Sequence, residues 1–306
     1  MPLDKVEKIW MDGELVDWDD ANIHVLTHTL HYGSGVFEGI RAYETDRGPA
    51  VFRLRDHLRR MFDSAKLLHI DIPFSLEQLV DATRETVRVN DVESCYIRPL
   101  VYLGYGEMGL NPLSSPVNVA IAVYPWGTYL GDEGVKHGVR MKVSSWRRMD
   151  PNINPSAAKG TGIYVNSILA KVEAIHAGYD EAILLNSQGF VAECTGENLF
   201  IVKNGRMITP PLSSGALDGI TRDSVMTIAR DLGVDVVEAN LVRSDLYLAD
   251  EAFLTGTAAE VVPMRAVDDR QIGEPGPITR KIQETYFAAI HGDVDQYKGW
   301  LDYVRE

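Results

Sequence analysis

The spacing of apolar residues along the chain separates helical segments from short strands. Apolar residues at intervals of three and four predict an amphipathic helix over residues 54–68. Ser75 and Gln78 have the spacing of a capping box and predict a second helix, which ends near Asn90. The same helical spacing predicts three further helices, over residues 164–177, 220–232 and 278–290.

Short apolar or alternating runs predict strands between these helices. Asp12 and Gly13 form a strong two-residue turn signal, which predicts a hairpin over residues 9–16. Further strands are predicted over residues 37–43, 50–54, 95–103, 117–124, 139–144, 181–185, 190–192, 198–202, 206–209, 234–237, 251–254 and 261–262. Strands and helices do not alternate strictly, so we expect an α+β fold with largely antiparallel sheets and flanking helices.

A glycine- and proline-containing stretch at residues 125–131 is the best candidate for a linker. The chain has 306 residues, enough for two ordinary domains. We expect a small N-terminal domain over residues 1–125, a linker over 126–136, and a larger C-terminal domain over 137–306 that carries the chemically important lysine.

Composition narrows the class of function. The net charge is −14, and no stripe of Lys and Arg is present, so nucleic-acid binding is not expected. The N-terminus lacks an apolar signal segment and no apolar run has the length of a membrane span, so a cytoplasmic location without membrane attachment is expected. Cys95 and Cys194 are expected to be free thiols in a reducing compartment.

Two patterns invite interpretations that the surrounding residues do not favour. His24, His28 and His31 have helical spacing, but no Cys or carboxylate cluster nearby completes a metal shell, so packing is favoured and no metal is expected. The glycines between Gly104 and Gly109 match a dinucleotide-binding pattern. Prolines follow where its helix should begin, which argues against that interpretation.

Lys159 lies among small, uncharged residues, unlike most lysines of the chain. Partial desolvation there favours the free amine, the form that attacks a carbonyl carbon. An ordinary loop lysine is the alternative. Arg98 lies in an apolar strand, two residues from Tyr96 and therefore on the same face. Its guanidinium needs an acceptor, either an internal salt bridge or a substrate carboxylate.

The stretch from Glu193 to Arg222 combines an acid, two short strands and a glycine turn that opens a helix. Gly219 lets the backbone N–H groups of Ile220 and Thr221 approach an anion, and the helix dipole favours a phosphate there. By itself this turn is a weak signal, and a bare helix start is the favoured interpretation of it. The acid and the turn keep a specific spacing with Asn198 and Thr209.

This spacing resembles the class IV aminotransferase signature at each of its fixed positions, in Glu193-Cys-Thr-Gly-Glu-Asn-Leu-Phe200, Ile208-Thr209 and Leu217-Asp-Gly-Ile-Thr-Arg222. More specifically, Tyr96-Ile-Arg-Pro99, Gly104-Tyr-Gly-Glu-Met-Gly-Leu110 and Gly256-Thr-Ala-Ala-Glu260 are similar to branched-chain amino acid aminotransferases, over residues 9–300. The resemblance implies a two-domain pyridoxal-phosphate (PLP) fold of type IV.

The resemblance also implies a cofactor site. Lys159 would bind the aldehyde carbon of PLP and act as the catalytic acid and base, and Glu193 would face the ring nitrogen. Tyr164 would bind the ring hydroxyl. Arg60, the second arginine of a pair on the first helix, would bind the phosphate with the turn Gly219, Ile220 and Thr221 and with Thr257.

The family's substrate residues can be placed in the same way. The resemblance implies ping-pong transamination of leucine, isoleucine and valine with 2-oxoglutarate, with amino acids and 2-oxo acids as small-molecule partners. Tyr32 and Leu110 match positions that the family supplies from a neighbouring subunit, so a homodimer is expected, or a higher homo-oligomer such as a hexamer. The substrate residues would be Phe37, Gly39, Tyr96, Arg98, Tyr32, Met108, Leu110, Trp126, Tyr129, Thr257 and Ala258.

Other functions remain compatible with these residues. A fold type IV transaminase for D-amino acids or (R)-amines would keep Lys159 and Glu193. A lyase such as aminodeoxychorismate lyase would keep both but would not need Arg98. A non-enzymatic PLP carrier or another small-molecule binding protein is the alternative from a different class.

Overall fold

The computed structural model describes residues 3–305 and contains two compact units. Unit 1 comprises Met1–Trp126, Ala158–Ile163 and Ala289–Glu306, and unit 2 comprises Gly127–Ala157 and Tyr164–Ala288. Two segments that the sequence placed in the C-terminal domain, residues 158–163 and 289–306, therefore belong to unit 1. One of them carries Lys159.

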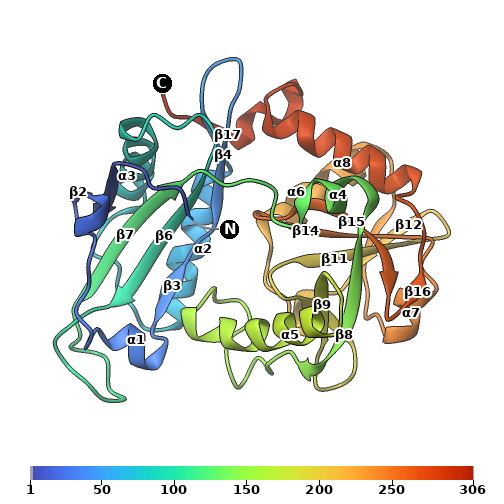
Figure 1. The fold of residues 1–306 in the computed structure, drawn as a ribbon, viewed down its shortest axis with the longest axis horizontal. Coiled ribbons are helices and arrows are strands. Elements are labelled where there is room, and N and C mark those ends of the chain that lie inside the picture. The colour runs from blue at the N-terminus through green and yellow to red at the C-terminus, as the bar shows by residue number, and fades with distance from the viewer. Residues whose placement is uncertain (1–2, 306) are drawn as a thin grey trace. The chain divides into compact units, whose positions relative to one another are not determined.

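The sheet of unit 1, drawn in Figure 1, has only antiparallel strand pairs within residues 3–305. Its strands follow the order β17-β5-β4-β6-β7-β1-β2, and β3 pairs with β6. The strands are β1 (Lys8–Met11), β2 (Glu14–Asp17), β3 (Gly35–Phe37), β4 (Ile40–Tyr43), β5 (Ala50–Phe52), β6 (Cys95–Leu103), β7 (Val117–Tyr124) and β17 (Leu301–Tyr303).

Helices α2 (Leu54–Leu67) and α3 (Leu76–Val89) pack against this sheet (Figure 1). The apolar face of α2 buries Leu54, Leu58 and Met61 completely, in one cluster with residues of β6 and β7. Ser75 and Gln78 form the predicted capping box at the start of α3. The unit also contains α1 (His28–Tyr32), η1 (Trp18–Asp20), η2 (Thr161–Ile163) and η4 (Asp295–Trp300).

Backbone pairing holds residues 158–163 and the C-terminal strand β17 in unit 1. Gly160 forms an antiparallel bridge with Val36, and the Lys159 carbonyl accepts a hydrogen bond from the Phe37 N–H at 3.1 Å. Near the C-terminus, β17 pairs with β5, and Arg84 on α3 forms an ion pair with Asp302. Neither pairing has a signal in the local sequence, because the partners are more than 100 residues apart.

Unit 2 contains a mixed sheet with the strand order β10-β9-β8-β15-β14-β11-β12-β13, in which β16 pairs with β15. Pairs β8–β9, β8–β15 and β12–β13 are parallel, and the other pairs are antiparallel. The strands are β8 (Val139–Arg147), β9 (Glu181–Leu185), β10 (Val191–Cys194), β11 (Asn198–Lys203), β12 (Arg206–Thr209), β13 (Val236–Glu238), β14 (Glu251–Gly256), β15 (Glu260–Val267) and β16 (Arg270–Gln271).

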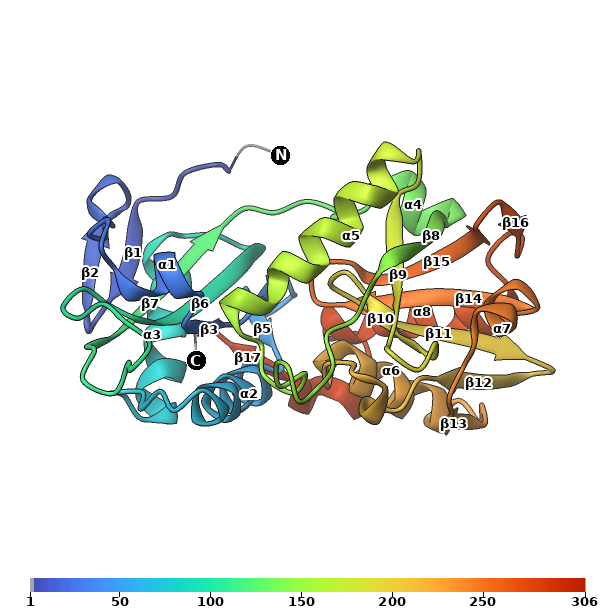
Figure 2. The same cartoon turned by 90° about the horizontal axis from the view of Figure 1, so that it is seen from below.

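Helix α5 (Tyr164–His176) packs along β8 and β9 (Figure 2), and α6 (Ile220–Asp231) packs on β14. Val225 and Ile228 form part of the buried face of α6, as the helical spacing predicted. The remaining helices that enter this unit are α4 (Gly131–His137), η3 (Leu212–Ser214), α7 (Arg243–Tyr247) and α8 (Pro277–Ile290).

The α+β fold with mostly antiparallel strands is confirmed, and one strand prediction was wrong. Residues 37–43 form the end of β3 and all of β4, separated by Glu38 and Gly39. Glu38 turns its carboxylate into the core, and a Cβ atom on Gly39 would lie 1.9 Å from the hydroxyl oxygen of Tyr96. The side-chain alternation of a continuous strand is interrupted there.

Candidate functional site

Lys159 is fixed by hydrogen bonds on both sides of its α-carbon. Its backbone N–H donates to the Ser64 hydroxyl of α2 at 3.0 Å, and its carbonyl accepts from the Phe37 N–H. Its amine nitrogen lies 5.2 Å from the centroid of the Phe37 ring. The lysine is half-buried, and the neighbouring Ala158 is buried. The backbone at Lys159 is therefore held in place from two sides, by α2 and by β3.

Five of the predicted substrate residues come together in unit 1. The Arg98 guanidinium lies 4.8 Å from the centroid of the Phe37 ring and 5.1 Å from that of Tyr96, which confirms that Tyr96 and Arg98 share a face of β6. The Tyr96 ring also lies 5.5 Å from that of Trp126, and Gly39 provides the space for its hydroxyl. The group combines aromatic surface with a guanidinium, which suits an apolar side chain and a carboxylate.

Three other predicted substrate residues are exposed on unit 1. Tyr32 on α1 packs against His28 with the ring centroids 4.6 Å apart, and it is 45% exposed. Met108 and Leu110 lie in the loop between β6 and β7, and Leu110 is 90% exposed. The structure does not bring these three side chains into the group around Arg98.

His28 holds the loop that carries Met108 and Leu110. One ring nitrogen lies 2.8 Å from the Gly109 carbonyl and the other lies 2.6 Å from the Ser34 hydroxyl. This histidine therefore has a structural role in the loop. Within residues 3–305, no group of three or more His, Cys, Asp or Glu side chains is arranged to hold a metal ion.

Arg60 lies on α2 and is bound by a buried carboxylate. Its Nε and Nη2 atoms donate to the two oxygens of Glu38, at 2.7 and 2.8 Å. The sequence predicted a phosphate-binding role for Arg60 but gave no sign of Glu38. That assignment stays a prediction, now with a defined orientation of the guanidinium.

Glu193 lies on β10 in unit 2 and is held by three donors. Its Oε1 atom lies 2.6 Å from a guanidinium nitrogen of Arg148. Its Oε2 atom accepts from the backbone N–H of Leu217 at 2.8 Å and, at 3.5 Å, from the Asn198 amide. A register shift of the β9–β10 pair falls beside it. Arg148 was not found from the sequence, because it follows β8 without a motif of its own.

The predicted phosphate-binding turn begins helix α6. Gly219 is the N-cap residue and, among the described residues, no side-chain cap covers the first turn of the helix. The N–H groups of such a turn are available to an anion. A Cβ atom on Gly219 would lie 2.0 Å from the Asn198 side-chain oxygen, so only glycine allows Asn198 its position. Thr221 is buried in the first turn.

The remaining predicted residues also lie in unit 2. Tyr164 is the first residue of α5, and Thr257 and Ala258 lie in the turn between β14 and β15. Tyr129 lies before α4, and the Lys171 amine lies 5.3 Å from the centroid of its ring. The structure places each residue at the start or end of an element, where backbone groups can bind a ligand.

A buried acidic cluster, formed by Glu181 and Glu197 next to Glu193, was not predicted from the sequence. Glu181 forms an ion pair with Lys171 at 2.6 Å and accepts from the Thr195 hydroxyl at 2.6 Å. Burial, followed by the charge of Glu181, raises the pKa of Glu197 to about 8. A neutral carboxyl group at Glu197 is therefore expected at neutral pH.

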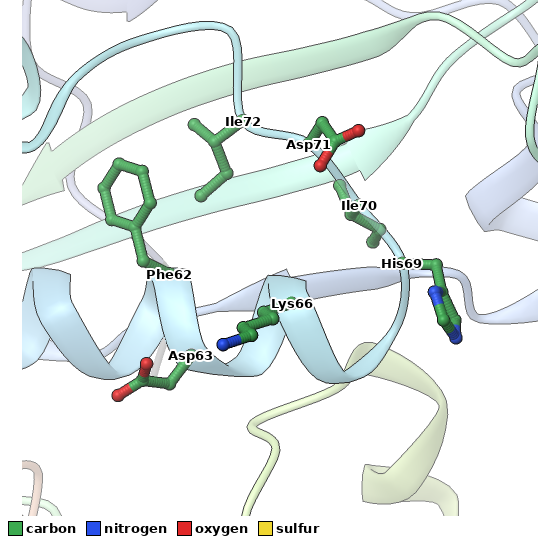
Figure 3. Close-up of a pocket in the computed structure, with 7 residues that line it drawn as sticks. All are labelled: Phe62, Asp63, Lys66, His69, Ile70, Asp71 and Ile72. Carbon is green, nitrogen blue, oxygen red and sulfur yellow. The ribbon is translucent and has the colours of Figure 1, made fainter.

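A separate pocket lies at the end of α2 (Figure 3). Phe62, Asp63 and Lys66 of α2 form one wall, and the segment that follows the helix forms the other. That segment contributes His69, Ile70, Asp71 and Ile72. None of the residues predicted to bind cofactor or substrate lines this pocket, so it does not belong to the candidate site.

The sequence and the fold are similar to those of known enzymes. A family model described as amino-transferase class IV matches residues 35–267. The branched-chain-amino-acid aminotransferase of Escherichia coli (strain K12) is 47% identical over 309 residues, which cover 100% of each chain.

Solved structures agree with this similarity. The branched-chain aminotransferase from Thermoproteus uzoniensis with norvaline has a TM-score of 0.94 at 48% identity, covering 98% of this chain and 100% of that one. The PLP form of the branched-chain amino acid aminotransferase from Thermobaculum terrenum has a TM-score of 0.92 at 36% identity, covering 98% of each chain. With its signature acid buried and its glycine turn opening a helix, the chain belongs to the class IV aminotransferases.

Proposed function

We propose that this chain is a branched-chain-amino-acid aminotransferase that uses PLP. It transfers the amino group of leucine, isoleucine or valine to 2-oxoglutarate, giving a branched-chain 2-oxo acid and glutamate. The observation that carries the proposal is Glu193, a buried carboxylate held by Arg148 and Leu217 at the first position of the class IV signature. Similarity to branched-chain aminotransferases over the whole chain supports the substrate class.

The residues fit the three parts of PLP that a protein must hold. Lys159 provides an amine for the aldehyde carbon, and Glu193 provides a carboxylate for the ring nitrogen. The start of α6 suits the phosphate, because among the described residues no side-chain cap covers the backbone N–H groups of its first turn. The phosphate is also bound by Arg60, Ile220, Thr221 and Thr257. The ring hydroxyl is bound by Tyr164. When bound, PLP supplies an electron sink for the substrate's α-carbon.

Lys159 acts as the acid and base. Its amine takes the proton from the α-carbon of the bound amino acid and later returns a proton, so that one group serves both steps. The hydrogen bonds of its backbone to Ser64 and Phe37 confine the motion to the side chain. Glu193 does not take part in this proton transfer, and Arg148 and the Leu217 N–H hold its carboxylate from within unit 2.

Substrate choice depends on aromatic surface and one guanidinium. Phe37, Trp126, Met108, Tyr129 and Ala258 form the apolar surface for the branched side chain. The α-carboxylate binds Tyr96 and the backbone of Thr257 and Ala258. Arg98 binds the second carboxylate of glutamate together with Tyr32 of a second copy, because Tyr32 of the same chain is exposed outside the group around Arg98. The short distance between the Arg98 guanidinium and the Tyr96 ring supports a shared binding face on β6.

A homodimer is proposed as the minimal active unit. One face of α5 exposes five apolar side chains, which is unusual for a helix that faces water. These residues are Val165, Ile168, Leu169, Val172 and Ile175. Covering them with a second copy removes apolar surface from water. The molar mass in solution, measured by light scattering, tests the proposed homodimer.

The cytoplasmic location stays a prediction. Among the described residues, no helix combines the length and apolar character needed to cross a bilayer.

The visible absorbance spectrum of the purified protein tests the function. We expect a band at about 410 nm, the range of PLP bound to a lysine. The band should move to the ultraviolet on addition of L-leucine and return with 2-oxoglutarate. A band that responds only to D-alanine or to an (R)-amine would support the fold type IV alternative. No band after reconstitution with PLP would refute the cofactor assignment.

A further inference from the structure

Glu38 is a completely buried carboxylate between β3 and β4. Both its oxygens are bound: Oε1 accepts from Arg60 Nε at 2.7 Å, and Oε2 accepts from Arg60 Nη2 and from His57 Nδ1, each at 2.8 Å. Its backbone N–H donates to the Pro99 carbonyl of β6 at 2.9 Å. The carboxylate is therefore anchored to the sheet at its own residue and to α2 through two side chains.

In this group Glu38 and Arg60 are charged and His57 is neutral. Burial alone would raise the pKa of Glu38, but Arg60 and His57 outweigh it and hold the pKa well below its ordinary value. Burial lowers the pKa of His57, so its imidazole is neutral at neutral pH. A neutral His57 that donates from Nδ1 leaves Glu38 and Arg60 as an ion pair with two parallel hydrogen bonds. Such a pair fixes the plane of a guanidinium as well as its position.

One face of α2 connects this pair to Lys159. His57, Arg60 and Ser64 recur at intervals of three and four residues, so they share that face. Ser64 accepts the hydrogen bond from the Lys159 N–H. On the strand side, Phe37 binds the Lys159 carbonyl, and Glu38 follows it directly. The same two elements therefore hold the lysine backbone and the arginine side chain.

We propose that Glu38 is a positioning residue that sets the guanidinium plane of Arg60, and with it the distance between the phosphate-binding arginine and Lys159. The inference rests on the proposed PLP site. A phosphate and an aldehyde carbon on one rigid ring have a fixed separation, so the protein groups that receive them need one as well. Glu38 does not contact the cofactor and acts through Arg60. His57 supports the carboxylate from the other side.

Cofactor binding to Glu38→Gln tests the proposal. The glutamine keeps the size of the side chain, but its NH2 group turns a donor toward Arg60 or His57. We expect the dissociation constant for PLP, measured by titrating the apoenzyme, to rise about 10-fold or more, the range for hydrogen bonds of charged groups. The dissociation constant for pyridoxal, which lacks the phosphate, should change less than about 2-fold, because Glu38 acts through the phosphate contact.

Two further variants separate positioning from a general loss of stability. Glu38→Asp keeps the charge and shortens the side chain by one methylene. It should therefore also weaken the binding of PLP more than the binding of pyridoxal, and the circular dichroism spectrum should stay unchanged. Glu77→Gln removes the exposed carboxylate that binds Arg55 in the same unit. The affinities for PLP and for pyridoxal should both stay unchanged. Glu77 is the matched control for loss of a carboxylate that binds an arginine of α2.

Each remaining outcome is decisive. Equal losses of PLP and pyridoxal affinity in both Glu38 variants would show that Glu38 only supports the fold. Unchanged PLP affinity in both would also refute the proposal, while the proposed function would stand as long as the wild-type protein binds PLP. A wild-type protein that binds no PLP would refute the proposed function, and this inference with it.

Discussion

The guanidinium of Arg148 lies 2.6 Å from the Glu193 carboxylate, and both side chains are less than 10% exposed, at 6% and 9%. Arg148 Nε also donates to the Gly215 carbonyl at 3.1 Å. The arginine therefore joins the strand that carries the signature acid to the loop before α6. Removing one partner of a buried ion pair leaves the charge of the other partner buried without compensation.

Replacing Arg148 with Met should lower the free energy of unfolding by about 3 kcal/mol, the range for a broken buried pair. Urea denaturation followed by circular dichroism measures the change. Arg206→Met is the control, because Arg206 forms an exposed ion pair with Asp235, and such pairs contribute about 1 kcal/mol or less. Equal effects of the two substitutions would contradict the role given to Arg148.

The elements of this fold could be predicted where their signal is local. The helix at α2 and the capping box of α3 depend on residues three and four apart, and both were predicted within a residue or two. Strand β17 was missed because its three residues gain order only by pairing with β5. Periodicity carries no information about such distant partners.

The candidate site divides in the same way. Lys159, Glu193 and Gly219 stand out in the sequence because their neighbours have unusual composition or spacing. Arg148 and Glu38 do not, because their function depends on a partner that lies far along the chain. A buried charge needs such a partner, so the supporting groups of a site are found only when the fold is known.

Gly219→Ala should weaken PLP binding without unfolding the protein. The φ angle of Gly219 is −75°, which alanine accepts, so the effect comes from the contact of its Cβ with Asn198. Asn198 donates to the Leu217 carbonyl at 2.9 Å and also contacts Glu193, so its displacement disturbs the whole turn. We expect about a 10-fold rise in the dissociation constant for PLP, measured by apoenzyme titration.

The control for this substitution is Gly299→Ala. A Cβ atom at Gly299 would meet no described atom within 4 Å, and the residue lies outside the site. Its PLP affinity should match that of the wild-type protein. If Gly219→Ala also kept normal affinity, the start of α6 would not be the phosphate site.

Arg98→Ala should impair glutamate and 2-oxoglutarate far more than leucine. In the proposed function the guanidinium binds the second carboxylate of glutamate, which leucine lacks. We expect kcat/KM for glutamate to fall about 100-fold, as for loss of a charge-assisted pair, with a fall of less than about 10-fold for leucine. Steady-state kinetics of each half-reaction give the two values. Equal losses for both amino acids would place Arg98 at the α-carboxylate instead.

Lys159→Ala should abolish transamination and leave the fold intact. The substitution removes the amine, but the backbone hydrogen bonds to Ser64 and Phe37 remain. Activity with leucine and 2-oxoglutarate, the absorbance band and the circular dichroism spectrum are the measurements. Lys5→Ala is the control, since Lys5 pairs with Asp19 on the surface. Near-normal turnover in the Lys159 variant would refute the mechanism.

The buried pair of Glu197 and Glu181 should make the stability of the protein depend on pH. The pKa of Glu197 rises from its ordinary value of 4.5 to about 8, because of burial and then the charge of Glu181, while Lys171 opposes the shift. Between these two pH values the folded state holds a proton that the unfolded state has released. Stability from this group is therefore complete below about pH 4.5 and declines as the pH rises toward 8.

Glu197→Gln should remove this dependence. The amide oxygen can still accept the Gly196 N–H, now at 3.1 Å from the Glu197 carboxylate, and no proton is exchanged. Thermal unfolding followed by circular dichroism at pH 5.5, 7 and 8.5 should give similar midpoints at the lowest pH and a higher midpoint for the variant at the highest. Glu14→Gln, at an exposed position of β2, should follow the wild-type curve at every pH. If the Glu197 variant ran parallel to the wild type, the carboxyl group would already be ionised in the folded protein, and Lys171 would have to balance both Glu181 and Glu197.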